Sequence, residues 1–403
     1  MFSEYLLKCR FYMATLLLFV VVCFPVLATL SFNSVEVNFF FSVVQLFFCL
    51  FLAPEVLRES YSAYKHSIVF RVCLLLMIVM VMGWFYLYIP FYGIYRSLLY
   101  LIQIPFFFSV LAWFRVHGSR GLQQIYYAKL IVVLLAILYM AYMYWQQDIE
   151  LWRKSVKGRP PIYRHIRHFN YDLALLIGLS AWLIVKDRFK PSLVVVLFFL
   201  FGFLTFWSGA RGQMLSLGVF LGLLMLSPHR VFFYKKLRVA GVAFLCGAIV
   251  LLMSGETHML LSSMVRSVEL ESLRAVTSNR TVIWLQTLPY VNESWLFGYG
   301  PEAFLRLKVR MGGIVQPHNF VVQFLLEFGV VGSFGVMIML LSSFRIYITS
   351  ILTKRLMAAG LLGAFLISQF VFALVDGIFY HIVPLTMYLI IAAYLYQLTT
   401  DCD

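Results

Sequence analysis

The chain has 403 residues, of which 63% are hydrophobic and 12% are charged, and its mean hydropathy is +0.90. Soluble domains are about 45–50% apolar and about 25% charged, so this composition excludes a soluble globular protein. Runs of about 20 apolar residues recur, each long enough to cross a hydrocarbon core of about 30 Å, and they predict an all-α polytopic membrane protein. A β-barrel would instead show alternating apolar and polar residues. The net charge of +15 is largely a topology signal in such a chain, so we expect no nucleic-acid partner.

Twelve segments are apolar and long enough to be predicted as spans. Most of the lysines and arginines lie in the short segments on one side of these spans, beginning with Lys8 and Arg10. The positive-inside rule therefore places both termini in the cytoplasm. We treat residues 1–403 as a single membrane domain, in which residues 254–318 form a long loop on the outer side, between spans nine and ten. The predicted spans are 11–31, 36–53, 68–89, 94–114, 125–145, 170–186, 191–208, 213–228, 237–253, 319–343, 356–375 and 382–399.

The remaining basic residues lie on the outer side, against the topological bias. Two of them are Arg96 and Arg211. The others form one group in the loop 146–169, which includes Arg167, and a second group in the long loop. One interpretation is a solvated loop surface, since long loops escape the positive-inside rule. The other is a positive outer face that binds an anionic ligand. Arg96 itself is interpreted either as an anchor that extends to the interface or as a ligand contact.

Arg211 lies in the short turn between spans seven and eight, where Ser208, Gly209 and Gly212 supply the small residues that such a turn needs. The arginine is therefore at or just below the membrane boundary. A charge at that depth is expensive unless it is paired, which makes Arg211 a candidate functional residue.

The long loop is predicted to contain two short helices. An amphipathic helix covers residues 261–269, and a second helix is predicted after an N-cap at Thr277 or Ser278. Arg280 then falls in the first turn of the second helix, where a cation opposes the helix dipole, so we expect it to be held there for a ligand. Further on, Gly298 and Gly300 predict a tight turn.

His318 directly precedes span ten. The positive end of that helix dipole is expected to lower the pKa of the imidazole and to keep it neutral, so that it can accept a proton. The alternative is an interfacial histidine with a structural hydrogen bond. Glu327, within span ten, is expected to be buried and paired. Asp376, at the outer end of span eleven, is expected to pair with an arginine, to orient His318 or to orient a sugar hydroxyl.

These motifs, in this order, resemble the O-antigen ligase and polymerase superfamily. The matching features are Ser208 to Gly212, Arg280 to Trp284, the pair Gly298 and Gly300, Pro317-His318-Asn319, Glu327 to Gly332, and Asp376-Gly377. The resemblance covers roughly residues 170–395, whereas the earlier spans match only in kind.

The resemblance implies a GT-C-like fold in the bacterial inner membrane, with the active site on the periplasmic side. It implies an inverting, metal-independent glycosyltransferase that needs no cofactor. The donor would be a glycan linked to undecaprenyl pyrophosphate, and the acceptor a hydroxyl of the lipid A–core of lipopolysaccharide. By the same resemblance, His318 is the catalytic histidine, Arg211 and Arg280 bind pyrophosphate, and Asp376, Asn319 and Arg96 support the site. Whether His318 is the base or only orients the acceptor stays open.

Three alternatives to an O-antigen ligase remain. A repeat-unit polymerase of the same superfamily would use a carrier-linked glycan as acceptor, and an O-oligosaccharyltransferase would use a protein hydroxyl. A transporter would also fit twelve spans, but the long loop between spans nine and ten and the lack of a visible internal repeat disfavour it.

Overall fold

The computed structural model describes residues 2–28, 34–86, 91–146, 163, 166–254, 280–307, 316–352 and 357–400. These ranges fold almost entirely into helices and contain no β-strand, which confirms the predicted all-α membrane fold. Backbone groups in a membrane must be satisfied within the chain, and a helix does this locally. The helices are α1 (Phe2–Ala28), α2 (Ser34–Phe51), α3 (Ala53–His66), α4 (Ile68–Tyr86), α5 (Phe91–Leu101), α6 (Gln103–Gln146), α8 (Ile166–Val185), α9 (Pro191–Trp207), α10 (Arg211–Leu226), α11 (Arg230–Ser254), α14 (Arg280–Glu293), α15 (Ala303–Arg306), α16 (Phe320–Leu352), α17 (Met357–Val375) and α18 (Ile382–Thr400).

Each of the twelve predicted spans coincides with helix in the described ranges. Within these ranges, six helices are long and apolar enough to cross a membrane, or up to seven if the bent pair α2 and α3 forms one span. A multi-pass membrane protein is therefore supported, while the number twelve remains a prediction.

Two local features differ from the predicted span pattern. Predicted spans four and five are not separated by a loop, because α6 continues from one into the other and bends at Gly118, whose φ is +52° and ψ is −140°. A helix that was not predicted, α3, follows α2 at an angle of 83°. Its sequence is polar on one face rather than uniformly apolar, which explains why a search for apolar runs misses it.

The bundle has central and peripheral helices. In the apolar stretch of α8, 94% of the residues are buried, whereas in the apolar stretch of α11 only 28% are buried. Leu245 and Ile249, for example, are exposed on α11, as expected for a surface that faces lipid. The central position of α8 brings its first residues against the candidate site described below.

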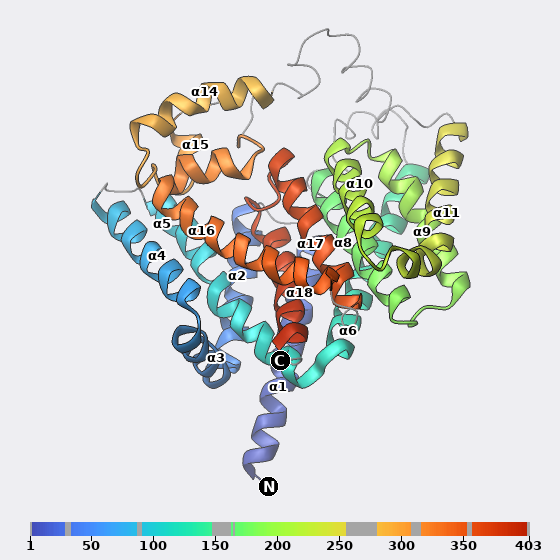
Figure 1. Cartoon of the computed structure of the whole chain (residues 1–403), viewed down its shortest axis with the longest axis horizontal. Coiled ribbons are helices and arrows are strands. Elements are labelled where there is room, and N and C mark those ends of the chain that lie inside the picture. Colours follow the sequence, from blue (N-terminus) through green and yellow to red (C-terminus); the bar gives the residue numbers. More distant parts are fainter. Residues whose placement is uncertain are drawn as a thin grey trace.

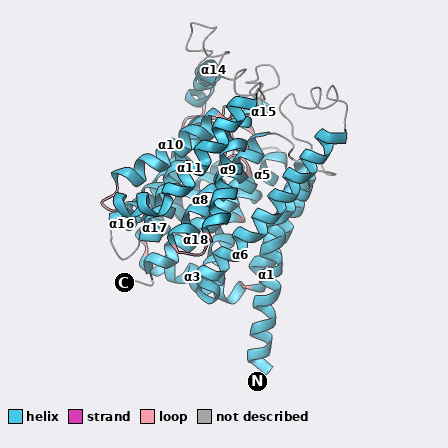
Figure 2. Cartoon of the chain, turned by 90° about the vertical axis from the view of Figure 1, so that its right-hand side faces the viewer, coloured by secondary structure: helices cyan, strands magenta, loops and turns pink. Residues whose placement is uncertain are grey.

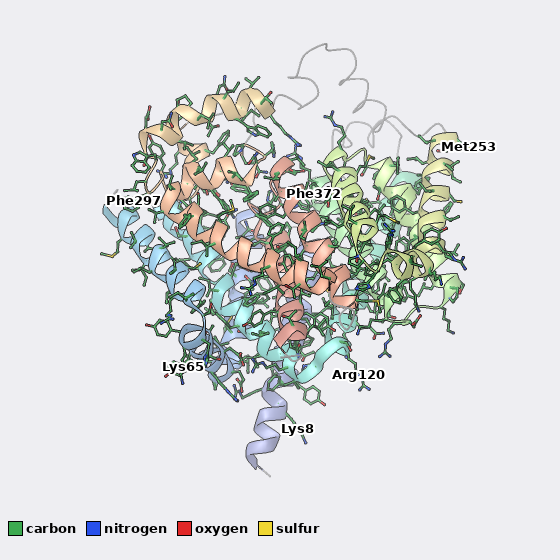
Figure 3. The ribbon with its side chains drawn as sticks, viewed as in Figure 1. Lys8, Lys65, Arg120, Met253, Phe297 and Phe372 are labelled. Carbon is green, nitrogen blue, oxygen red and sulfur yellow. The ribbon has the colours of Figure 1, made fainter. Side chains whose placement is uncertain are left out.

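The described part of the predicted long loop, residues 280–307, lies at the end of the molecule opposite the N-terminus. Figures 1 and 2 both show α14 at the top and the N-terminus at the bottom. In Figure 3, Lys8, Lys65 and Arg120 lie toward the lower end, whereas Met253 and Phe297 lie toward the upper end. Lys8, Lys65 and Arg120, three of the basic residues that were assigned to one side of the membrane, thus lie toward the opposite end from Phe297 in the long loop. The predicted helix at 261–269 and the N-cap at Thr277 or Ser278 lie outside the described residues.

The loop after α14 is fixed to a break in α16. Gly329 has φ +61°, and around this break Tyr299 and Gly300 donate backbone hydrogen bonds to the carbonyls of Leu326 and Glu327, at 2.8 Å each. In return, Val330 donates to the carbonyl of Trp295 at 2.7 Å. The loop thus satisfies backbone groups that a broken helix leaves open. The positive φ of Gly298 and Gly300 confirms the predicted tight turn.

Candidate functional site

His318 is held in a strained conformation directly before α16. Its φ is +53°, in the left-handed region, which costs a residue with a Cβ about 1–2 kcal/mol. The preceding carbonyl, that of Pro317, accepts a hydrogen bond of 2.7 Å from Nε1 of Trp284 on α14. The Arg-x-x-x-Trp motif therefore places α14 against the histidine segment and helps to keep His318 in this conformation.

Asn319 caps α16. Its Oδ1 accepts hydrogen bonds from the backbone N–H groups of Val321 at 2.9 Å and Val322 at 3.2 Å. This is the usual geometry of an asparagine N-cap, and it fixes the start of the helix one residue after His318. The structure thus gives Asn319 a positioning function.

Asp376 and Arg167 are the groups in contact with the imidazole. Asp376 follows the end of α17, and its Oδ1 lies 3.6 Å from Nδ1 of His318. Arg167, near the start of α8, places Nη1 3.1 Å from both ring nitrogens of His318. Its Nε lies 3.9 Å from Oδ2 of Asp376. The carboxylate also accepts a hydrogen bond of 2.8 Å from the N–H of Gly377, which orients it. Of the roles left open for Asp376, contact with His318 and with an arginine are both present.

The electrostatics of this group follow from burial and from the nearby charges. Burial lowers the pKa of His318 below 6.5, and Arg167 lowers it further, while the contact with Asp376 acts in the opposite direction. Burial alone would raise the pKa of Asp376, but His318 and Arg167 lower it far below its usual value. A neutral imidazole thus lies beside an ionised carboxylate. The lowered histidine pKa was predicted, although the main cause is burial rather than the helix dipole.

Arg280, the first residue of α14, reaches the end of α17. Its Nη1 donates a hydrogen bond to the carbonyl of Val375, the residue before Asp376. Burial lowers the pKa of Arg280; Asp376 raises it, and the positive charges of Arg167 and Arg211 lower it. These four charged groups therefore lie within electrostatic range of one another.

Arg211 begins α10, directly after the turn that contains Gly209, whose φ is +62°. The neighbouring Gly212 lies against the side chains of Phe372 and Val375, so the start of α10 packs on the end of α17 that carries Asp376. The predicted pyrophosphate-binding pair, Arg211 and Arg280, is thus brought to the same helix end. The binding of pyrophosphate by this pair is a proposal.

Arg96 belongs to a separate buried cluster. Its Nε lies 3.3 Å from Oε1 of Glu302, and its Nη2 donates to the carbonyl of Tyr380. The side chain is buried, so the interpretation of Arg96 as an anchor that extends to the interface is wrong. Glu302 also accepts a hydrogen bond of 2.7 Å from the hydroxyl of Tyr380, and its N–H donates to Glu327 at 3.1 Å. Glu327 is buried, as predicted, and its Oε1 accepts this hydrogen bond. Among the described residues, Arg96 contacts the segment from Asp376 to Tyr380 through the carbonyl of Tyr380, and its supporting role remains a proposal.

Sequence reasoning missed the specific position of Arg167. It was counted only as one of several cations in the predicted loop 146–169. The available signal was its place three residues before the predicted span 170–186, since Arg211 and His318 also stand just before predicted spans.

The described groups have the chemistry that an anion-binding site with a neutral base requires. Arginines donate charge-assisted hydrogen bonds to phosphate oxygens, and an imidazole beside a carboxylate can accept a proton from a hydroxyl. A comparison with protein families gives this geometry a context. Residues 195–337 match the family model described as O-antigen ligase.

This O-antigen ligase match includes Arg211, Arg280 and His318, whereas Arg167 and Asp376 lie outside the matched residues. It supports the O-antigen ligase and polymerase superfamily that the motifs resemble, and with it a glycosyltransferase-like reaction on lipid-linked substrates. The search of curated proteins gave no match.

Proposed function

We propose that the protein is an O-antigen ligase, which transfers a glycan from undecaprenyl pyrophosphate to a hydroxyl of the lipid A–core. The observation that carries this proposal is the convergence of His318, Asp376, Arg280 and Arg167 within a chain whose residues 195–337 match the O-antigen ligase family. The distances support the base and its carboxylate partner, and the shared electrostatic range of the arginines supports a pyrophosphate site.

In the proposed reaction, the acceptor hydroxyl attacks the anomeric carbon of the donor glycan. The new C–O bond forms as the bond to the pyrophosphate oxygen breaks, with inversion at this carbon. His318 accepts the hydroxyl proton, and Asp376 stabilises the imidazolium that results. The leaving group is undecaprenyl pyrophosphate, and Arg211 and Arg280 stabilise the negative charge that develops on it. Arginine suits this task because its pKa keeps it charged. We include metal independence in the proposal.

The proposed location is the bacterial inner membrane, with both termini in the cytoplasm and the site on the periplasmic face. The loop 254–318 would then be a periplasmic part of a single membrane domain. Support comes from the distribution of basic residues and from the position of α14 at the end opposite the N-terminus (Figures 1 and 2). A membrane-impermeant thiol reagent would test this topology, with single cysteines introduced near Lys8 and in the loop as its targets. The proposal predicts labelling from the periplasm in the loop but not near Lys8.

A deletion strain tests the choice of acceptor. A ligase predicts lipopolysaccharide without polymer, together with accumulated long carrier-linked chains. Lipopolysaccharide capped by a single repeat would instead identify the repeat-unit polymerase and contradict the ligase proposal. Solute exchange in vesicles by purified protein that binds no carrier lipid would identify a transporter.

Complementation of the same strain tests the site. His318→Ala and Arg211→Ala are each expected to abolish transfer while the protein level in the membrane stays unchanged. Arg238→Ala, on the peripheral helix α11, provides a control for the loss of an arginine. Wild-type transfer in His318→Ala or Arg211→Ala would assign that residue a structural role only.

A further inference from the structure

Another polar cluster is built from the same three segments that form the candidate site. Its members are His168, Gln316 and His381. The amide nitrogen of Gln316 donates a hydrogen bond of 3.3 Å to Nε2 of His381. The ring centroid of His381 lies 4.6 Å from that of His168, with the ring planes at 71°. His381 therefore contacts both of the other members.

The contact between Gln316 and His381 is one between neutral groups. Burial lowers the pKa of His381 well below its usual value, and nearby basic groups, including His168 and Arg96, lower it further. Because Nε2 of His381 accepts from the amide, we assign the ring proton to Nδ1. The imidazole thus fixes the orientation of the glutamine amide without adding a charge.

The amide oxygen of Gln316 is buried without a donor. Gln316 is 2% exposed, and among the described residues no group donates a hydrogen bond to its Oε1. A buried acceptor that lacks a donor is costly, and proteins usually satisfy such an atom with water or a ligand. This oxygen is therefore a position at which a ligand that donates a hydrogen bond would be stabilised.

The glycine of the Asp-Gly motif makes room for this amide. A Cβ at Gly377 would overlap Oε1 of Gln316. The φ of Gly377 does not lie in the left-handed region, so its backbone conformation does not require glycine. The space for the amide does. The unsatisfied oxygen thus lies against the residue that directly follows Asp376.

The chemistry of this oxygen selects a hydroxyl rather than a phosphate. An amide oxygen can only accept hydrogen bonds, and so can an ionised phosphate oxygen, so the two would repel each other. A sugar hydroxyl can donate to the amide oxygen of Gln316. Arg211 and Arg280 have the opposite preference, because a guanidinium can only donate.

The cluster also differs from the proposed pyrophosphate-binding pair in its surroundings. Arg211 is among the charges that act most strongly on Arg280, whereas Arg96 is among those that act most strongly on His381. Asp376 acts on both. In a displacement with inversion, the incoming hydroxyl and the leaving pyrophosphate stand on opposite sides of the anomeric carbon. A hydroxyl-binding cluster that shares Asp376 but has different neighbours from the two arginines therefore suits the acceptor.

We propose that Gln316 and His381 form a hydroxyl-binding subsite for the acceptor glycan, in which Oε1 of Gln316 accepts a hydrogen bond from a sugar hydroxyl and His381 holds the amide in place. This inference rests on the proposed function, because it takes a glycan as acceptor and His318 as the base. Two residues of chain span at most about 7 Å, so a sugar held at Gln316 can present another hydroxyl to His318. The subsite thereby gives the acceptor a defined position.

Direct binding of two probes to the purified full-length protein tests the subsite. The probes are lipid A–core, as acceptor, and a glycan linked to undecaprenyl pyrophosphate, as donor. Gln316→Met keeps the side-chain length but removes the amide, and it is expected to weaken binding of lipid A–core about fivefold, the effect of one neutral hydrogen bond. His381→Phe keeps the ring but removes the nitrogen that orients the amide, and about a twofold loss is expected. Affinity for the donor should stay unchanged in both variants.

The matched controls are Gln369→Met and His66→Phe. Gln369 is a buried glutamine of α17 that donates to Ser216, and His66 is exposed at the end of α3. Both controls should keep the wild-type affinity for both probes. Thermal unfolding checks that the variants are folded, and His381→Phe carries the test if Gln316→Met does not fold.

The possible outcomes separate this inference from the proposed function. Unchanged affinity for lipid A–core in both site variants would overturn the subsite, including the case in which only kcat falls, which would make Gln316 a positioning residue for His318. A loss confined to the donor would assign the cluster to the donor glycan and overturn the acceptor subsite. Wild-type protein that does not bind lipid A–core would contradict the proposed ligase function itself.

Discussion

Replacement of Trp284 by phenylalanine tests whether α14 positions the proposed base. The indole Nε1 donates a 2.7 Å hydrogen bond to the carbonyl of Pro317, which is buried. Phenylalanine keeps an aromatic ring of similar packing but removes the donor. A buried carbonyl that loses its partner costs about 1–3 kcal/mol. The neighbouring His318 has a left-handed backbone conformation that depends on such contacts, so part of this cost is expected to appear as displacement of the imidazole.

The magnitude follows from transition-state arithmetic. About 1.4 kcal/mol of lost transition-state stabilisation lowers the rate tenfold, so the full cost corresponds to a decrease of about 5- to 150-fold. We expect a decrease of about tenfold in kcat for Trp284→Phe, with a smaller change in the KM for the donor. The assay uses purified protein with carrier-linked glycan and lipid A–core.

The matched control is Trp295→Phe. Trp295 lies in the same loop region, but its side chain is 57% exposed. This variant is expected to keep wild-type kcat. Equal activity of Trp284→Phe and Trp295→Phe, in proteins with the same thermal unfolding midpoint, would refute the positioning of His318 by α14.

Three further predictions concern packing, pH and metal. Gly329→Ala is expected to lower the free energy of unfolding by about 1–3 kcal/mol, because φ is +61° and the new Cβ would overlap the backbone of Leu296. Gly335→Ala in the same helix should be nearly neutral, since its Cβ would meet ordinary contacts at 3.5 Å. Similar unfolding midpoints for the two variants would contradict this packing. The acidic limb of kcat/KM should lie below pH 6.5, because burial lowers the pKa of His318 and activity disappears as pH falls through that pKa. Asp376→Asn removes a group that raises this pKa, so the limb of its residual activity should move to lower pH, and a shift to higher pH would argue against His318 as the base. Transfer is expected to continue in excess chelator; activity that a divalent cation restores would contradict metal independence.

The helices could be predicted because the membrane imposes a simple rule on the sequence. A spanning segment must be apolar and must satisfy its own backbone, so each solid apolar run is helical. The exceptions carry no such signal. The helix α3 is amphipathic, and α6 remains one element across Gly118 because a kink rather than a loop separates its two halves.

The candidate site could be predicted only in part, because its contacts join distant segments. His318, Arg280 and Asp376 were selected from their places at helix ends, and the structure brings them together. Arg167 contacts His318 across 151 residues of sequence, and no local spacing announces such a contact. Arg96 was misinterpreted for the same reason, because its contact also joins distant segments. Its position at a helix end suggested an exposed anchor, but its partner Glu302 comes from the long loop.

The placement of Arg280 is unfavourable for its own helix, and the structure supplies a physical reason for it. A cation in the first turn of α14 opposes the dipole of its own helix. Its guanidinium, however, donates to the carbonyl of Val375, the last residue of α17, where the dipole of that second helix is negative. The two helix ends therefore compensate each other through one side chain. Arg167 and Arg211 lie near the starts of α8 and α10, so the proposed pyrophosphate site combines arginine charges with the positive ends of several helices. On this reasoning, a lysine in place of Arg280 would keep the charge but could not form the same planar, multidentate set of bonds to a carbonyl and to phosphate oxygens, and we expect it to bind the donor less tightly than wild type.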